Sequence, residues 1–263
     1  MLLSKSDAGT SISQVTWDLT HNTISIPAGK GGWLKRVEIQ MCPTRTTVVC
    51  AGGYVRLHNS SADWDPFEFT SAGDTAVTEG GGSNGAPVVY EVNKELPGNS
   101  DVTSDFRPNS AEVQHIKLTV VWEFGGKPNV ETFSKFIYPL YANAVSATAR
   151  ASPGNMQIPG GKGGRIRYIV DIGFGALTTV SNMGGLREFS CDAYDMTPCE
   201  KYTTYQTALG ASGGGSMRPD ITLWDGPCPA NATFTTHLTP TAATAQILAS
   251  GLFWERPIRK TVS

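Results

Sequence analysis

The sequence predicts an all-β protein made of two tandem eight-stranded antiparallel jelly rolls (β-sandwiches) related by internal duplication. Three observations support this fold class. A glycine-rich heptapeptide occurs twice, apolar and polar residues alternate in short runs, and turn-forming residues are abundant, with 29 glycines and 16 prolines. Charged residues make up only 17% of the chain. This composition is typical of short strands joined by many turns.

The internal repeat is the strongest of these observations. Residues 26–32 read Ile-Pro-Ala-Gly-Lys-Gly-Gly and residues 158–164 read Ile-Pro-Gly-Gly-Lys-Gly-Gly, so six of seven positions match at an offset of 132 (158 − 26). At the same offset, eight of 27 positions are identical between 97–123 and 229–255, where ordinary residue frequencies give about two. Independent matches at one offset indicate gene duplication.

The duplication divides the chain into two domains. We expect the first jelly roll at residues 1–126, a linker at 127–140, and the second jelly roll with a basic C-terminal tail at 141–263. The linker follows the turn-rich sequence Gly-Gly-Lys-Pro-Asn at 125–129.

Alternating apolar residues predict six to eight strands in each copy. The clearest runs are 37–41 and 115–122, with their counterparts at 166–172 and 247–254. Trp122 and Trp254 lie in matched runs, so we expect both in the core. We interpret the long glycine-rich stretches at 70–87 and 203–219 as surface loops.

The repeated heptapeptide is interpreted as a turn between two strands. Its candidate residues in the two copies are Pro27, Gly29, Lys30, Gly31, Pro159, Gly161, Lys162 and Gly163. A phosphate-binding loop would need Ser or Thr after the lysine and a helix after that, but two glycines and a strand-like run follow here. Glycines in such a turn serve its backbone shape. We therefore expect no cofactor there.

Catalytic and metal-binding patterns are weak, so we expect no enzyme and no metal. None of the four histidines lies within four residues of another, and none recurs at the offset of 132, which disfavours a duplicated cupin metalloenzyme. No nucleophile elbow occurs. Paired acids at Asp63 and Asp65, and at Asp192 and Asp195, fit turns or calcium loops, and turns are favoured. Two glycosylation-type sequons begin at Asn59 and Asn231.

The five cysteines leave two interpretations open. Cys42 and Cys50, like Cys191 and Cys199, are eight positions apart, and Cys228 is left over. Buried free thiols are favoured in a reducing cytoplasm, whereas an oxidised virion would allow a clip across a hairpin.

Net charge and the chain ends bound the choice of partners. The net charge of −2 argues against direct nucleic-acid binding. No run of 18 apolar residues occurs, and the first residues are too polar for a signal peptide, so we expect synthesis in the cytoplasm. Arg256, Arg259 and Lys260 follow the last predicted strand. They form either a solvated end or a contact with anionic lipid headgroups, at about 1 kcal/mol per charge.

The duplicated sandwich, its size, its Ile-Pro-Ala-Gly type turns and the missing active site together resemble one family. The chain is similar to the double jelly-roll major capsid proteins of tailless icosahedral viruses, the lineage of adenovirus hexon and the coats of membrane-containing phages. The resemblance covers nearly the whole chain but rests on architecture rather than on signature residues.

The resemblance implies a structural role in a virion. Three chains would form a homotrimer whose six rolls mimic a hexagon, and trimers would tile an icosahedral shell over an internal membrane. The partners would be further copies of the chain, minor capsid or penton proteins, and lipid. The chain would be made in the host cytoplasm and assembled into the virion.

Two other classes remain. A virion spike or carbohydrate-binding double sandwich would use exposed aromatics, such as Trp17, Trp33, Trp64 and Trp224, as a binding platform. A bicupin-like enzyme would require a bound metal.

Overall fold

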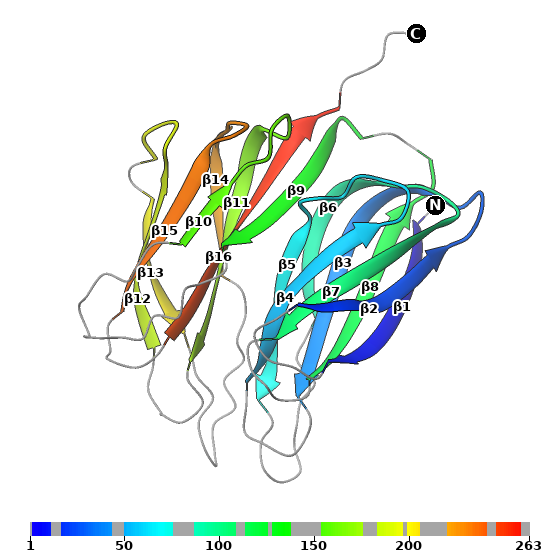
Figure 1. Ribbon diagram of the computed structural model, residues 1–263, viewed down its shortest axis with the longest axis horizontal. Helices are drawn as coiled ribbons and strands as arrows, with labels where there is room; N and C mark the ends of the chain where they lie inside the picture. Colours follow the sequence, from blue (N-terminus) through cyan, green and yellow to red (C-terminus); the bar gives the residue numbers. More distant parts are fainter. Residues whose placement is uncertain are drawn as a thin grey trace.

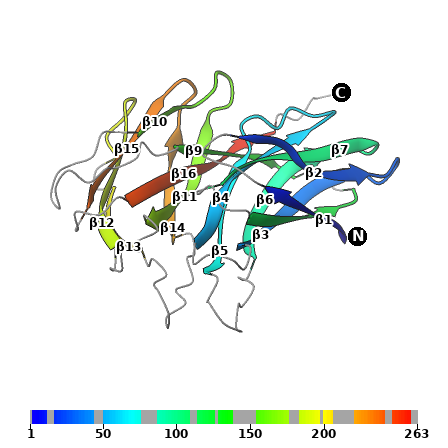
Figure 2. The same ribbon diagram turned by 60° about the horizontal axis from the view of Figure 1, so that its bottom comes forward.

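In the computed structural model, two β-sandwiches lie side by side, as two views of the ribbon show (Figures 1 and 2). The structure describes residues 2–11, 17–43, 50–75, 87–108, 114–125, 128–137, 154–175, 183–196, 199–205, 220–240 and 246–258. These residues form 16 strands and contain no helix that could span a membrane. Every strand ladder among them is antiparallel, as the alternating sequence pattern predicts.

The first roll has two facing four-stranded sheets, ordered β1-β8-β3-β6 and β2-β7-β4-β5. Its strands are β1 (Leu2–Ser11), β2 (Asp18–Ile26), β3 (Gly32–Pro43), β4 (Cys50–Asn59), β5 (Glu68–Thr75), β6 (Val88–Leu96), β7 (Ser100–Pro108) and β8 (Gln114–Glu123). Eight strands wound in this order define a jelly roll.

The second roll repeats this order, with sheets β9-β16-β11-β14 and β10-β15-β12-β13. Its strands are β9 (Val130–Ile137), β10 (Gly154–Gln157), β11 (Gly164–Gly175), β12 (Met183–Cys191), β13 (Glu200–Tyr205), β14 (Asp220–Cys228), β15 (Thr233–Pro240) and β16 (Gln246–Pro257). The predicted fold class is therefore confirmed: the chain is a tandem pair of eight-stranded jelly rolls.

The offset of 132 found in the sequence is also the structural offset. Strands β3 and β11 both start and end 132 residues apart, as do β6 and β14. The exception is the first strand of each roll. Leu2 pairs with Glu123, whereas Thr132 pairs with Glu255, so β1 and β9 are related by an offset of 130 (132 − 2).

The boundary between the rolls differs from the prediction. Residues 130–137, inside the expected linker, form strand β9, which pairs with β16 along its length. The second roll therefore begins by Val130 in the described part of the chain. The glycine-rich stretches at 76–86 and 206–219 lie outside the described residues.

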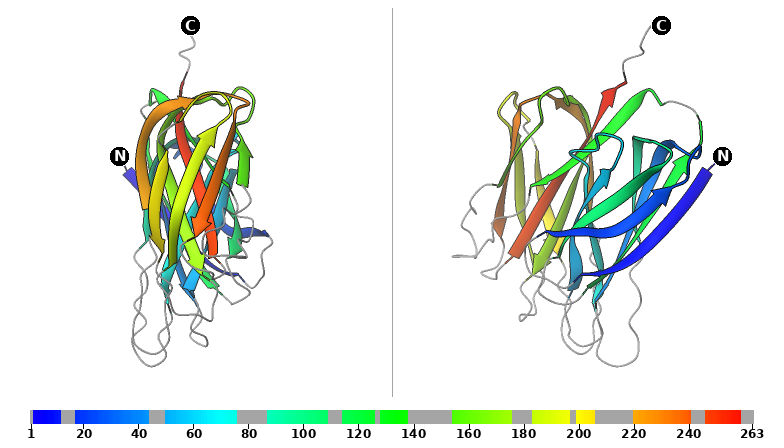
Figure 3. Two further views of the ribbon diagram at one scale, coloured as in Figure 1. Left: turned by 90° about the vertical axis from the view of Figure 1, so that its left-hand side faces the viewer. Right: turned by 45° about the vertical axis from the view of Figure 1, so that its right-hand side comes forward.

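Each roll has an apolar core between its two sheets, which face one another in Figure 3. Alternation along β6 is representative, because Tyr90, Val92 and Leu96 are buried while Glu91 and Glu95 are exposed. Trp122 and Trp254 are 3% and 0% exposed, which confirms their predicted place in the core.

The second core contains a buried ion pair that the first core lacks. The Arg187 guanidinium lies 2.8 Å from Asp171 Oδ2, and Ser250 donates to Asp171 Oδ1 at 2.6 Å. All three side chains are essentially unexposed. At the matching positions of the first roll (132 residues earlier) lie three buried aliphatic residues, Val55, Ile39 and Leu118.

Candidate functional site: the junction between the two rolls

The heptapeptide forms the same turn in both rolls. The backbone N–H of Lys30 donates to the carbonyl of Pro27 at 3.0 Å, and that of Lys162 donates to Pro159 at 3.1 Å. Gly29 and Gly161 have φ angles of 70° and 74°, a conformation that residues with a Cβ adopt only at a cost. The repeated glycine thus shapes the backbone.

A tryptophan fixes each turn to the core. The indole N–H of Trp122 donates to the Lys30 carbonyl at 2.7 Å, and that of Trp254 donates to the Lys162 carbonyl at 2.6 Å. These bonds satisfy a polar group on each buried ring. Because both turns are held in the same way, the two lysines leave equivalent places on the two rolls.

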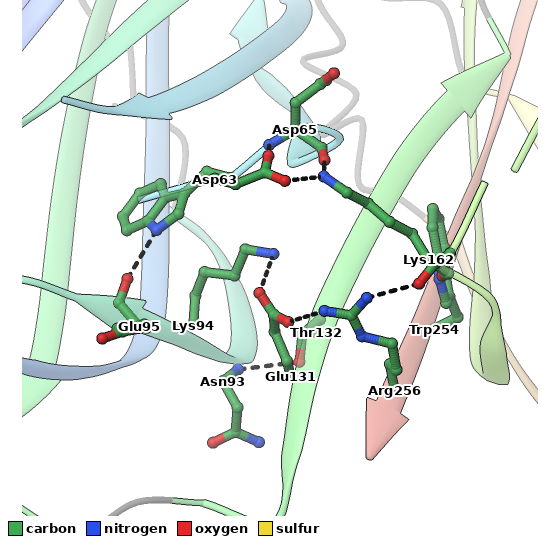
Figure 4. Close-up of polar contacts among 12 residues, drawn as sticks. Asp63, Asp65, Asn93, Lys94, Glu95, Glu131, Thr132, Lys162, Trp254 and Arg256 are labelled. Carbon is green, nitrogen blue, oxygen red and sulfur yellow. Dashed lines mark hydrogen bonds and ion pairs between the residues drawn. The ribbon is translucent and has the colours of Figure 1, made fainter. Parts of the chain in front are cut away.

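The environments of the two lysine side chains differ. Lys162 binds the Asp63 carboxylate at 2.5 Å and also donates to the carbonyl of Asp65, both in the loop between β4 and β5 of the first roll (Figure 4). This hydrogen bond is the main cause that lowers the pKa of Asp63. Lys30 is exposed and forms no such ion pair among the described residues. One turn therefore contacts the neighbouring roll and the other faces outward.

A second cation crosses the same boundary from the opposite direction. The Lys94 side chain, on β6 of the first roll, is 0% exposed, and its Nζ lies 2.8 Å from Glu131 Oε1 on β9 (Figure 4). Its Nζ also lies 3.7 Å from the centroid of the Phe133 ring. Burial lowers the pKa of Lys94 to about 8, and Glu131 opposes this shift. The ion pair and the ring partly offset the cost of burying an ammonium group.

Arg256 completes the cluster from β16. Its guanidinium lies 2.8 Å from Glu131 Oε2 and donates to the Gly161 carbonyl at 2.7 Å (Figure 4). Arg256 was a candidate for a membrane contact, and the structure places it in the junction with its side chain 37% exposed. Arg259 and Lys260 lie outside the described residues, so a lipid contact by the tail stays a prediction.

Aromatic packing forms the apolar half of the junction. Phe253 of β16 stacks on Tyr90 of the first roll with centroids 5.3 Å apart, and it lies 5.8 Å from Phe69. Phe136 of β9 lies 6.2 Å from Tyr54. Phe136, Phe253 and Val170 are buried in the same cluster as the core of the first roll. The rolls are therefore joined through a continuous apolar contact rather than by the connecting chain alone.

Backbone contacts add to this packing. The N–H of Phe136 donates to the Glu68 carboxylate at 2.9 Å, and the N–H of Glu68 donates to the Ser134 hydroxyl at 2.9 Å. Both groups are buried, and buried polar groups that lack partners are costly. These reciprocal bonds fix the register of β9 against β5.

The other candidate chemical groups serve turns and packing. Asp63 Oδ1 accepts from the N–H of Asp65, and Asp192 Oδ1 accepts from the N–H of Thr233, so the first acid of each pair has a turn role. Within the described part of the chain, no three His, Cys, Asp or Glu residues cluster as metal ligands.

The cysteines of the second roll are free thiols. Cys199 and Cys228 are buried and Cys191 is partly buried. Burial raises the pKa of each thiol. The side chains of Cys42 and Cys50 lie outside the described residues.

The tryptophan platform expected for a carbohydrate-binding protein does not form. Trp64 is 2% exposed and its indole donates to the Glu95 carbonyl at 2.7 Å. Trp17 lies under the Arg56 guanidinium, 4.1 Å from its ring centroid. Trp33 and Trp224 are half-buried.

Sequence reasoning missed Lys94, Glu131 and Phe133. One signal was present for Lys94: it follows Tyr90 and Val92 at the spacing of the buried face of a strand, where a lysine requires a partner. Nothing in the sequence identified Glu131 as that partner, because their contact depends on how the rolls dock.

The strand order and the junction define the protein as a double jelly roll whose two rolls form one unit. Its sequence matches no protein-family model and no curated protein. It is similar to solved structures that include N-glycanase F (PNGase F), with 10% identity, 97% of both chains covered and a TM-score of 0.42.

Two viral proteins are also similar. One is VP54 of PBCV-1, fitted into a reconstruction of the virophage Sputnik, with 9% identity, 97% of this chain and 94% of that chain covered, and a TM-score of 0.40. The other is the major capsid protein P2 of bacteriophage PM2, with 7% identity, 98% and 99% covered, and a TM-score of 0.34. All three scores are below 0.5, so the fold assignment rests on the strand order.

Proposed function

We propose that this chain is the major capsid protein of an icosahedral virus and acts by assembling into trimers. The observation that carries the proposal is the buried junction, which holds two equivalent rolls side by side as one block (Figure 1). One chain thus presents two similar units at a fixed spacing. Three such chains supply six similar units, which suits a hexagonal tile.

Further parts of the proposal concern the environment of the shell. The tiles pack into an icosahedral lattice over an internal membrane, with minor capsid or penton proteins at special positions. Arg259 and Lys260 of the basic tail contact anionic lipid headgroups. The chain is made in the host cytoplasm, functions in the virion without enzymatic activity, and makes no direct contact with nucleic acid, in keeping with its net charge of −2.

Mass and shape measurements test the proposal. Multi-angle light scattering of the purified chain at micromolar concentration should give a trimer of 84 kDa (3 × 28.0). Negative-stain electron microscopy should show particles with a hexagonal outline. A monomer at every accessible concentration would count decisively against a capsid role.

A further inference from the structure

The junction inside the chain has two dissimilar halves. The inserting surface, on the first roll, consists of the Asp63 loop and strand β6. The receiving surface, on the second roll, consists of the Lys162 turn, Phe133 on β9 and the end of β16 at Arg256. Such a contact is heterologous, because a different surface is used on each side.

Duplication gives each roll a copy of both surfaces. The Asp63 loop corresponds to the Asp195 loop of the second roll, which joins the same pair of strands. The match is close, since Trp64 and Met196, the residues that follow, are 2% and 3% exposed. The chain uses one inserting and one receiving surface internally, which leaves one of each available.

The available receiving surface lies on the first roll. Its turn carries Lys30, which is exposed and makes no ion pair in the described part of the chain. Phe124 occupies the position of Arg256 and is 51% exposed, one of the few exposed large apolar side chains among the described residues. Leu3 takes the place of Phe133, because it pairs with Trp122 as Phe133 pairs with Trp254. An exposed lysine beside apolar groups is a suitable seat for an acidic loop.

The available inserting surface lies on the second roll. Asp195 is exposed in its loop, as Asp63 is, and β14 is an edge strand like β6. Gly226 takes the position of Lys94, so the buried cation of the internal junction has no counterpart here. The contact formed by this surface would therefore avoid the cost of burying an unpaired ammonium group.

We propose that the Lys30 turn and Phe124 of one copy bind the Asp195 loop and β14 edge of a second copy, reproducing the internal junction between chains. This inference rests on the proposed trimer and identifies its contact surface. The occupant is a second copy because the two available halves are complementary in charge and each matches a half already docked inside the chain. A heterologous contact of this kind closes into a ring when its rotation fits.

Charge reversal tests the pairing. Lys30→Glu and Asp195→Lys should each raise the concentration at which trimers dissociate by at least about tenfold, since each places like charges together. The double variant Lys30→Glu with Asp195→Lys should recover most of the loss. Phe124→Asp tests the apolar part and should act in the same direction. The readout is sedimentation velocity over a dilution series, with circular dichroism to confirm that each variant is folded.

Lys117→Glu is the matched control. Lys117 is exposed on β8 of the same roll, six residues or roughly 20 Å along the strand from Glu123, and it introduces the same change in net charge. It should leave assembly unchanged. Wild-type trimers that tolerate all three single substitutions would overturn the contact while leaving the capsid proposal intact. A wild-type chain that stays monomeric would overturn both.

Discussion

Removal of one partner from the buried pair of Asp171 and Arg187 should strongly destabilise the second roll. In Arg187→Met, the Asp171 carboxylate loses both guanidinium contacts, at 2.8 and 3.0 Å, and keeps only the Ser250 hydroxyl. An uncompensated buried charge of this kind costs about 3–5 kcal/mol. At about 2–4 °C per kcal/mol for a protein of this size, we expect the melting temperature to fall by roughly 10 °C.

Removal of both partners should cost much less. The first roll has Ile39 and Val55 at these positions, both fully buried, so this fold already accommodates an apolar pair there. We expect Asp171→Ile with Arg187→Met to unfold within about 2 kcal/mol of the wild type, because no charge is left unpaired and Ser250 can still donate to Thr236. The coupling energy in the double-mutant cycle should therefore exceed about 2 kcal/mol.

Chemical denaturation followed by tryptophan fluorescence, together with calorimetry, measures these differences. Ile39→Val is the reference for an ordinary core truncation in the first roll, at about 1 kcal/mol. The reasoning fails if Arg187→Met costs no more than this reference. It also fails if the two single losses simply add in the double variant.

Three further outcomes are expected. Gly31→Ala should lower the free energy of unfolding by about 1–3 kcal/mol in thermal melts, because its Cβ would lie 2.2 Å from the backbone nitrogen of Gly98; a neutral effect would contradict the close approach. Relative to Lys94→Met, the wild type should gain stability as pH rises from about 8 to 10.5, because over that window the unfolded lysine keeps a proton that the folded one has lost; a flat difference would refute this. Iodoacetamide mapped by mass spectrometry should modify Cys191 before Cys228, since Cys191 is partly exposed and Cys228 is buried, and the reverse order would contradict the described burial.

The repeat made most of the fold predictable. Because Ile26 and Ile158 start the same turn, one offset located corresponding strands in both rolls, and Trp122 and Trp254 were correctly expected in the core. Strand β9 was missed for a physical reason: its register against β16 is displaced by two residues from the common offset. A strand that follows a different spacing gives no match in a comparison made at 132.

The junction was less predictable than the fold. Lys94 stood at a buried position of an alternating strand, so the need for a partner could be seen. Its partner Glu131 lies on another roll, and no local pattern encodes how two rolls dock. Arg256 shows the same limit, since a cation near the end of a chain has the same sequence signature whether it faces a membrane or a neighbouring carboxylate.

The glycine at position 251 has a consequence for the order in which chains pair. A Cβ there would lie 2.3 Å from the Phe136 ring, so only glycine allows this ring to lie flat on β16 and face the first roll. At the equivalent place the first roll has Thr119 opposite Ser6, with no ring and no space for one. The aromatic half of the junction can therefore form with the second roll only. Each chain recognises its own second roll before it meets another copy, so exchange of rolls between chains is disfavoured from the start.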